Sequence, residues 1–282
     1  MKNRWLMGAA AAALTVAGAV SAQAADLPTR KEAPAPVFVP PPFNWTGFYI
    51  GGNAGGVFGS GNITSTVIDP TFGVIGADWP NTHFGSNSGF IGGGQAGYNW
   101  QTGAFVLGVE TDFDGSSLSR SRTIIGPTFG TSALLAPNDF LTAIGSIKLN
   151  WLGSTRARVG FVATPDNRLM FYGTGGVAYG GGRAHLNVYD AQNGWFWSTN
   201  GLYGGGGDNN KTRTGWTLGG GVEYAWTNNI IIGAEYLYFN LGSKTFTSYP
   251  NLAAAAVFPN VYGSTKVDFN GSVIRARVSY KF

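Results

Sequence analysis

The only histidines in the chain are His83 and His185, and cysteine is absent. A thiol nucleophile, a disulfide framework and a cysteine-ligated metal site are therefore excluded. A catalytic triad would have to use His83 or His185 as its general base. His83 falls in a long polar stretch and His185 follows an alternating one, and no motif links either to Ser and Asp. We therefore expect no enzymatic activity, no catalytic residue and no metal site.

A glycine-rich segment, Gly92 to Gly97, matches the G-x-G-x-x-G spacing of dinucleotide-binding loops. That motif binds pyrophosphate where a helix begins inside a βαβ unit. Here Tyr98-Asn99-Trp100 and then a turn follow, so the sequence predicts no helix at this point. The glycines instead indicate crowding in a small, strongly curved sheet.

Charged residues alternate with apolar residues in several segments, as Arg275 and Arg277 do with Ile274 and Val278. A period of two places the charges on one face of a strand and the apolar residues on the other. Unpaired charges inside a narrow closed sheet are costly, so we predict pairing of opposite signs. The expected interior ionic network comprises Glu110, Asp112, Arg156, Arg158, Arg213, Glu223, Glu235, Arg275 and Arg277.

Eight segments that alternate in this way are expected to be strands. They cover residues 45–58, 88–100, 104–115, 146–163, 169–184, 212–226, 230–244 and 266–282. Each is longer than the roughly 5–6 residues of an average strand, and long enough for the ~9–11 residues that cross a bilayer at a tilt. The sequence therefore predicts an all-β fold, an eight-stranded antiparallel up-and-down transmembrane barrel.

Short and long connections alternate between these strands. Residues 101–103, 164–168 and 227–229 are short and rich in Gly, Asn, Asp and Pro, as hairpin turns are. Residues 59–87, 116–145, 185–211 and 245–265 are long and polar. Short periplasmic turns and long extracellular loops are typical of outer-membrane barrels. With an even strand number, both termini are expected in the periplasm.

Aromatic residues concentrate where the strands meet the short turns. In a membrane barrel such residues form a girdle at the lipid–water interface. The expected girdle comprises Trp45, Tyr49, Tyr98, Trp100, Phe161, Phe171, Tyr224, Trp226, Tyr280 and Phe282. The apolar face is therefore expected to lie outside, against lipid, and the sheet must close because lipid offers no partner for backbone groups.

The composition agrees with a membrane barrel. Of 282 residues, 45 are glycine, 14% are aromatic and 11% are charged, with a mean hydropathy of +0.01. That hydropathy is too low for a bundle of membrane helices, and the apolar content is too high for disorder. No cluster of basic residues indicates nucleic-acid binding.

The first 24 residues are expected to be a signal peptide. Lys2 and Arg4 precede an apolar run that ends in Ala22-Gln23-Ala24, a small-residue cleavage site. Residues 25–44 contain six prolines and are expected to form an extended periplasmic linker. Residues 45–282 then form the barrel.

The chain resembles the outer-membrane immunogenic protein or porin family of alphaproteobacteria, within the OmpA-like eight-stranded class. The resemblance lies in WTGFYIGGNAGG at 45–56, GFIGGGQAGYNWQTGAFVLGVETDFD at 89–114, RARVGFVATPDNRLMFYGTGGVAYG at 156–180, GWTLGGGVEYAWTNNIIIGAEYLYFNLG at 215–242 and SVIRARVSYKF at 272–282. It implies an integral outer-membrane protein. It also implies that Val278, Tyr280 and Phe282 form the signal read by the barrel-assembly machinery. Some relatives bind haem, which makes His83 and His185 weak haem candidates, although no cofactor is expected.

Three functions remain open at this point. The first is a structural, surface-exposed envelope protein with a charged and plugged lumen. The second is a small-solute porin with a narrow gated pore, favoured by inward glycines. The third is a loop-mediated binding protein for haem or a host-surface ligand. Outer-membrane lipid, lipopolysaccharide and the assembly machinery are the expected partners.

Overall fold

The computed structural model describes residues 41–59, 62–70, 73–83, 87–127, 140–190, 195–198, 212–250, 255–256, 260 and 262–282. The signal peptide and the linker up to residue 40 lie outside the described residues, so these two assignments stay predictions. In the described part of the chain, no helix is long and apolar enough to cross a membrane.

Eight long strands form the barrel, as the sequence predicts. They are β1 (Gly47–Gly59), β4 (Asn87–Thr102), β5 (Phe105–Ser116), β7 (Phe140–Val162), β8 (Leu169–Asp190), β10 (Thr212–Ala225), β11 (Ile230–Pro250) and β12 (Tyr262–Lys281). At the ends joined by short turns, their bounds differ from the predicted ones by at most a few residues.

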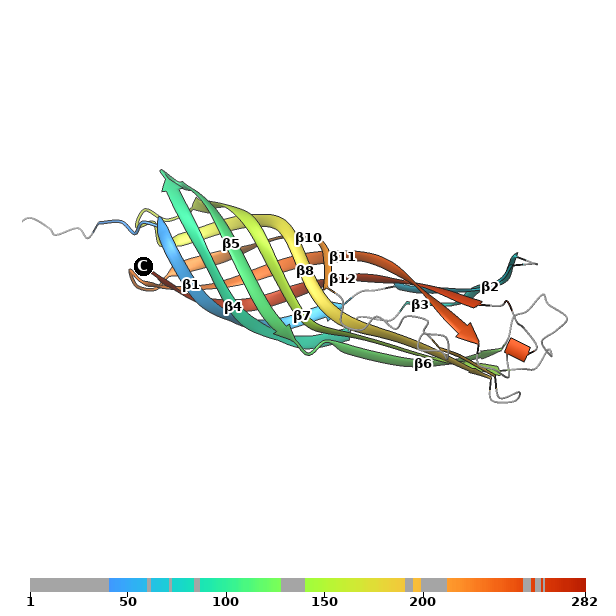
Figure 1. Cartoon of the computed structure of the whole chain (residues 1–282). Coiled ribbons are helices and arrows are strands. Elements are labelled where there is room, and N and C mark those ends of the chain that lie inside the picture. The colour runs from blue at the N-terminus through green and yellow to red at the C-terminus, as the bar shows by residue number, and fades with distance from the viewer. Residues whose placement is uncertain are drawn as a thin grey trace, which may run out of the picture. The chain divides into compact units, whose positions relative to one another are not determined.

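Each barrel strand pairs antiparallel with the next one along the chain, from β1–β4 to β11–β12. The first and last strands also pair, from Tyr49 opposite Lys281 to Gly59 opposite Gly271. This last pairing closes the sheet (Figure 1). Closure removes the two free edges, so each backbone ladder finds its partners within the sheet. The predicted fold class is confirmed.

The register puts one face of each strand inside the barrel. On β5 the burial pattern alternates strictly from Phe105 to Asp114, with Val106 and the acidic residues buried and the odd-numbered residues outside. A slip by one residue would send Glu110 and Asp112 into lipid and Val109 and Phe113 into the interior. The alternation of charged and apolar residues therefore determines the register.

The stretches predicted as long polar loops contain further strands. Four barrel strands continue into them, and β2 (Asn62–Asp69), β3 (Gly73–His83), β6 (Ser119–Pro127) and β9 (Trp195–Ser198) pair with these extensions or with each other. Threonine, valine and isoleucine favour strands, but outside the membrane the outer face of a strand does not need to be apolar. The period-2 apolar signal therefore stops at the membrane although the hydrogen-bonded ladders do not.

The outer wall carries two aromatic belts. At the end with the short turns, the exposed aromatics include Phe48, Trp100, Phe161 and Trp226; at the other end they include Phe58, Phe90, Phe113 and Trp216. Trp151 and Phe161 lie ten residues apart on β7. With a rise of ~3.3 Å per residue and a tilt of ~40°, that is roughly 25 Å, the height of the apolar band of an outer-membrane barrel.

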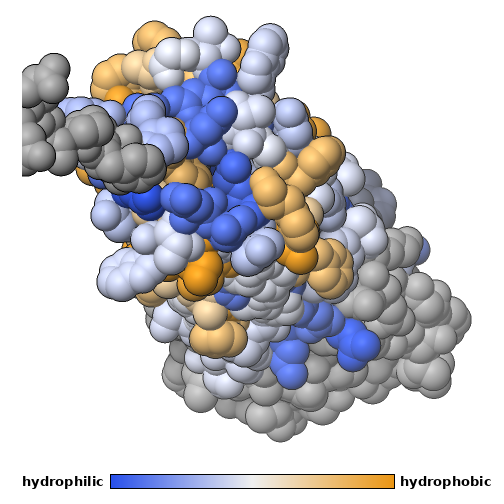
Figure 2. All heavy atoms as spheres, turned by 90° about the vertical axis from the view of Figure 1, so that its left-hand side faces the viewer, coloured by the Kyte–Doolittle hydropathy of each residue, from blue (hydrophilic) through white to orange (hydrophobic). Residues whose placement is uncertain are grey.

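Figure 2 looks at the end that carries the short turns. It shows hydrophilic residues gathered at this end and hydrophobic residues toward the sides. The polarity is that expected for a wall in lipid and an end in water.

A cysteine pair across the closing seam tests the topology. Ala54 on β1 and Ala276 on β12 are register partners on the outer wall. The chain has no native cysteine, and directly opposed Cβ atoms lie within reach of a disulfide. We expect the Ala54→Cys/Ala276→Cys protein to cross-link on oxidation, visible as faster migration of the heat-denatured chain in SDS gels without reductant.

The matched control is Ala54→Cys/Ala157→Cys. Ala157 lies on the outer wall of β7, which is separated from β1 by β4 and β5. This pair should not cross-link. Equal cross-linking in both proteins, or none in the first, would contradict the closed eight-strand order.

Candidate functional site in the barrel interior

A layer of charged side chains fills the middle of the barrel. Arginines from β7 and β12 face carboxylates from β5, β10 and β11 across the interior. The members are Glu110, Asp112, Asp114, Arg156, Arg158, Glu223, Glu235, Arg275 and Arg277, each at most 4% exposed. The layer holds four arginines and five carboxylates, so opposite charges meet in nearly equal number.

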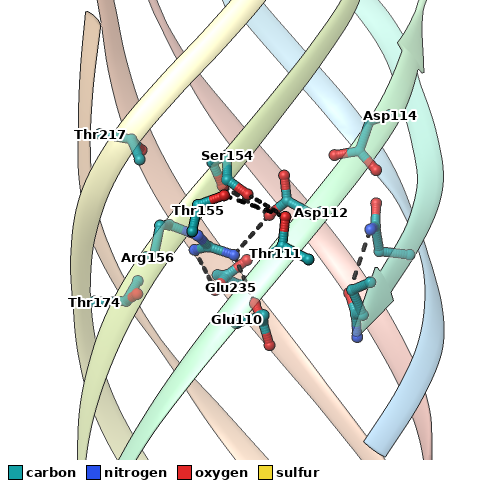
Figure 3. Close-up of polar contacts among 12 residues, drawn as sticks. Glu110, Thr111, Asp112, Asp114, Ser154, Thr155, Arg156, Thr174, Thr217 and Glu235 are labelled. Atoms are coloured by element: carbon teal, nitrogen blue, oxygen red, sulfur yellow. Dashed lines mark hydrogen bonds and ion pairs between the residues drawn. The ribbon is translucent and has the colours of Figure 1, made fainter. Parts of the chain in front are cut away.

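Arg156 lies at the centre of this layer. Its Nη2 donates to Glu110 at 2.6 Å and to Asp112 at 2.7 Å, and its Nη1 donates to Glu235 at 2.9 Å. Figure 3 shows these three carboxylates converging on the guanidinium from different sides. Because Glu235 comes from β11, Arg156 ties strands on opposite sides of the barrel through the lumen.

The other arginines extend the network on both sides. Arg275 donates to Asp112 and Glu235, each at 2.7 Å, and to Asp114. Arg277 pairs with Glu110, with Glu223 at 3.3 Å and with Glu235 at 3.0 Å. Arg158 pairs with Glu223 at 2.8 Å and with Glu110 at 3.2 Å. Each arginine thus contacts at least two carboxylates, which replace the water that a buried guanidinium loses.

Two tyrosines extend the network toward the short turns. Tyr49 donates to Glu110 at 2.6 Å and accepts from Arg158 at 2.8 Å. Tyr172 donates to Glu235 at 3.0 Å and accepts from Arg277 at 2.9 Å. The Arg158 guanidinium also lies 4.0 Å from the centre of the Tyr172 ring. Both hydroxyls therefore bridge a carboxylate and an arginine.

Inward glycines make room for these two rings. A Cβ at Gly97 would collide with the Tyr49 hydroxyl, and one at Gly221 would lie 2.7 Å from the Tyr172 hydroxyl. The glycine positions on the inner wall are thus occupied by neighbouring side chains. They do not widen the lumen at these levels.

Apolar clusters cover the charged layer on both sides. Toward the short turns, one cluster comprises Phe43, Trp45, Val106, Val162, Met170, Tyr172, Ala225 and Ile231. Toward the other end, a second cluster comprises Val57, Ile91, Leu149, Leu152, Ala178, Leu237, Phe239, Leu241, Val267, Phe269 and Val273. The interior is therefore layered, with charges between two apolar plugs.

A small cavity lies between the charged layer and the second apolar cluster. Asp112, Asp114, Ser154 and Arg275 line it on one side and Leu237 and Phe239 on the other. Its volume is about 10 Å³, roughly what a single water molecule needs.

Comparison with known proteins agrees with this architecture. Residues 10–282 match the model of the outer membrane protein beta-barrel domain. The chain belongs to this family. The 31 kDa outer-membrane immunogenic protein of Brucella melitensis is 37% identical over 267 residues, which cover 94% of this chain and 95% of that protein.

Two further similarities are more distant. The 22 kDa outer membrane protein of Rhizobium leguminosarum is 31% identical over 219 residues, covering 77% of this chain and 72% of that protein. The alignment with the solved structure of the outer membrane protein OprG from Pseudomonas aeruginosa covers 85% of this chain and 98% of the OprG chain. The TM-score is 0.43 and the sequence identity is 12%. Localisation of this family member in the outer membrane follows from the family and the named relatives.

Two residues expected in the aromatic girdle lie inside the barrel instead. Trp45 is completely buried and donates its indole N–H to the backbone oxygen of Asn167 at 2.7 Å. Tyr49 has the same parity as Asn53, which is also buried, whereas Phe48 and Ile50 face outward. The assignment of Trp45 and Tyr49 to the girdle was wrong, because Trp45 precedes the first strand and turns into the mouth.

The boundary of the barrel also lies earlier than expected. Phe43, assigned to the linker, is buried, and its N–H donates to the Asp166 oxygen at 2.9 Å. Its ring meets the Trp45 ring edge-on at 5.1 Å. The last residues of the predicted linker are thus part of the barrel.

The remaining girdle residues face outward. They are Tyr98, Trp100, Phe161, Phe171, Tyr224, Trp226, Tyr280 and Phe282. Val278 and Tyr280 share the exposed face of β12, and Phe282, the residue after this strand, is exposed as well. Their role as an assembly signal stays a prediction.

Arg213 and Asp114 depart from the expected network. The Arg213 guanidinium lies 3.9 Å from the centre of the Phe269 ring, at the second apolar cluster rather than in the central layer. Asp114, absent from the expected set, is 1% exposed and pairs with Arg275. Its spacing of two from Asp112 is the sequence signal that identifies it.

The haem candidates lie on strands rather than in loops. His83 is the last residue of β3, opposite Asn62, and His185 lies within β8, opposite Ser146. Their side chains are outside the described set. Among the side chains that the structure describes, no group of three or more His, Cys, Asp or Glu is arranged to hold a metal ion.

Removing Arg156 tests the energetic role of the charged layer. Arg156→Ala leaves Glu110, Asp112 and Glu235 with fewer partners in a dry interior. Breaking a buried ion pair from one side costs ~3–5 kcal/mol. We expect the unfolding free energy, measured by urea titration of the barrel in lipid vesicles, to fall by about that amount.

Two variants complete this test. Arg156→Lys keeps the charge but loses the planar fork, so its loss should be intermediate. Lys266→Ala removes an exposed cation on β12 and should change the free energy by less than ~0.5 kcal/mol. Equal losses for Arg156→Ala and Lys266→Ala would show that the layer does not stabilise the barrel.

Proposed function

We propose that this family member is a non-enzymatic structural protein of the outer membrane. Its barrel has a closed, non-conducting lumen, anchors the chain and presents the strand hairpins at the cell surface. The observation that carries this proposal is the central layer, in which four arginines and five carboxylates fill the cross-section of the lumen.

The layered interior supports closure for ions and small solutes. A permeating ion would have to displace Arg156 or Arg275 from several carboxylates at once. It would also have to cross two apolar clusters, where its hydration shell has no substitute. An eight-stranded barrel is only wide enough for side chains to fill it.

The mouth at the short turns has a closure of its own. Trp45 is held by two hydrogen bonds, from its backbone N–H to Gln101 at 2.8 Å and from its indole to Asn167 at 2.7 Å. Phe43 packs beside it, with the Lys281 ammonium 5.5 Å from the centre of the Phe43 ring. The segment before β1 thus blocks the short-turn end of the lumen with the side chains of Phe43 and Trp45.

We infer the orientation of the barrel in the membrane from the difference between its two ends, one with short turns and one with long hairpins. Short turns face the periplasm and long hairpins face the exterior in bacterial outer-membrane barrels. Both the start of β1 and the end of β12 lie at the short-turn end. We therefore place both termini in the periplasm and β2, β3, β6 and β9 outside the cell.

The two other functions make different demands on the molecule. A gated small-solute porin requires the Arg156–Glu235 contact to open, and the inward glycines that favoured it are covered by Tyr49 and Tyr172. A binding protein for haem or a host-surface ligand requires a site on the hairpins. The closed lumen favours the structural role over the porin and leaves surface binding as an additional property.

Planar-bilayer recording tests closure. We expect the purified protein to show no steady ion conductance, and liposomes that contain it to swell in small sugars no faster than empty ones. The reason is that the ionic layer and both apolar clusters occlude the lumen.

Arg275→Ala is the diagnostic variant and Lys266→Ala its control. Steady conductance in the unaltered protein that changes in Arg275→Ala, and not in Lys266→Ala, would locate an ion path along the arginines. That result would support the porin and refute the plug.

Labelling of intact cells tests the orientation. Asn260 lies at the hairpin end, Thr102 is the last residue of β4 at the first short turn, and both are exposed. With Asn260→Cys we expect reaction with a membrane-impermeant maleimide on intact cells, and with Thr102→Cys only after permeabilisation. The reverse pattern would place the hairpins in the periplasm.

A further inference from the structure

Two cations lie opposite each other on the outer wall. Lys148 on β7 and Arg183 on β8 are register partners, and both are exposed. Like charges at directly opposed positions destabilise a strand pair. In the described chain around them, Ser119, Ser146 and Asn150 carry no charge. An anion from outside the chain would turn this repulsion into attraction.

The pair lies at the depth of lipid headgroups. Lys148 is three residues beyond Trp151 on β7, and Arg183 is four residues beyond Tyr179 on β8. With ~3.3 Å per residue and a tilt of ~40°, both lie roughly 8–10 Å beyond the aromatic belt at the hairpin end. The belt marks the edge of the hydrocarbon, and the polar region of a bilayer begins just outside it.

Three neighbouring aromatic rings lie on the outer wall nearer the membrane centre than the two cations. The Phe113 and Trp151 rings stack with centres 5.3 Å apart, and the Tyr179 ring follows at 6.3 Å from Trp151. Glycine permits this arrangement, because a Cβ at Gly181 would collide with the Trp151 indole and one at Gly153 with the Tyr179 ring. The three rings form an apolar platform across β5, β7 and β8.

We propose that this surface binds lipid A, the phosphorylated glycolipid of the outer leaflet. A headgroup phosphate would lie between Lys148 and Arg183, and an acyl chain would lie on the Phe113–Trp151–Tyr179 platform. Under the orientation proposed above, the hairpin end faces the outer leaflet, whose principal lipid is lipopolysaccharide. The match is one of charge, depth and apolar area on a single face of the wall.

Lipid A titration tests the site in the whole folded protein. The protein is placed in phosphatidylcholine nanodiscs, diphosphoryl lipid A is added, and bound lipid is counted by native mass spectrometry. Lipid A enters both leaflets, so the result does not depend on the orientation of the barrel. For Lys148→Ala/Arg183→Ala we expect an affinity about 30-fold lower, from two cations near an anionic surface. Lys266→Ala should bind as the unaltered protein does.

Two further arms decide the source of the anion and guard against misfolding. Phosphatidylglycerol should lose much less than lipid A in the double variant, because its phosphodiester carries one negative charge, whereas a lipid A phosphate is a monoester that carries up to two. If the double variant fails to fold, Lys148→Gln alone replaces it, and raising NaCl from about 0.05 to about 0.5 M should weaken lipid A binding to the unaltered protein. Unchanged lipid A affinity in a folded variant, no salt dependence, or an equal loss for phosphatidylglycerol would overturn the proposal.

Discussion

Backbone hydrogen bonding in lipid is the constraint on which the rest of this structure depends. A sheet in hydrocarbon must close, because an open edge leaves N–H and C=O groups without partners. Here closure occurs after eight strands, when β1 pairs with β12. Eight strands enclose only enough space for side chains. The polarity is therefore inverted, with apolar residues outside and charges confined to a narrow interior.

Confinement explains the chemistry of the interior. Arg156, Arg158, Arg275 and Arg277 are buried away from bulk solvent, and each is surrounded by carboxylates. Arg158 and Arg277 also donate to a tyrosine hydroxyl, that of Tyr49 and of Tyr172 respectively. Such a layer is costly to break from one side and specific in its geometry. It also ties β7 to β11 and β5 to β12 across the lumen, contacts that the strand ladders alone do not make. In the function that we propose, the same residues that stabilise the barrel also occlude it.

The sequence predicts the parts of this molecule that follow a period of two. All eight barrel strands and the pairing of Glu110 with Arg156 and of Glu235 with Arg275 follow from that alternation. The alternation does not predict the positions of Trp45 and Phe43, because both residues precede the first strand. They enter the short-turn end of the barrel through a tertiary contact with the turn at Asn167. The alternation also does not predict the strands beyond the membrane, because polar strands in water have no apolar face. Tyr49 does follow the alternation, because it has the same parity as Asn53, and both side chains are buried inside the barrel.

Water is the smallest permeant that an open lumen would admit, so osmotic water permeability tests the central claim most directly. Stopped-flow light scattering of vesicles at increasing protein density measures it. The layered interior predicts the same permeability as vesicles without protein at every density. A permeability that rises in proportion to the protein, with the low activation energy of flow through a pore, would contradict the closed lumen.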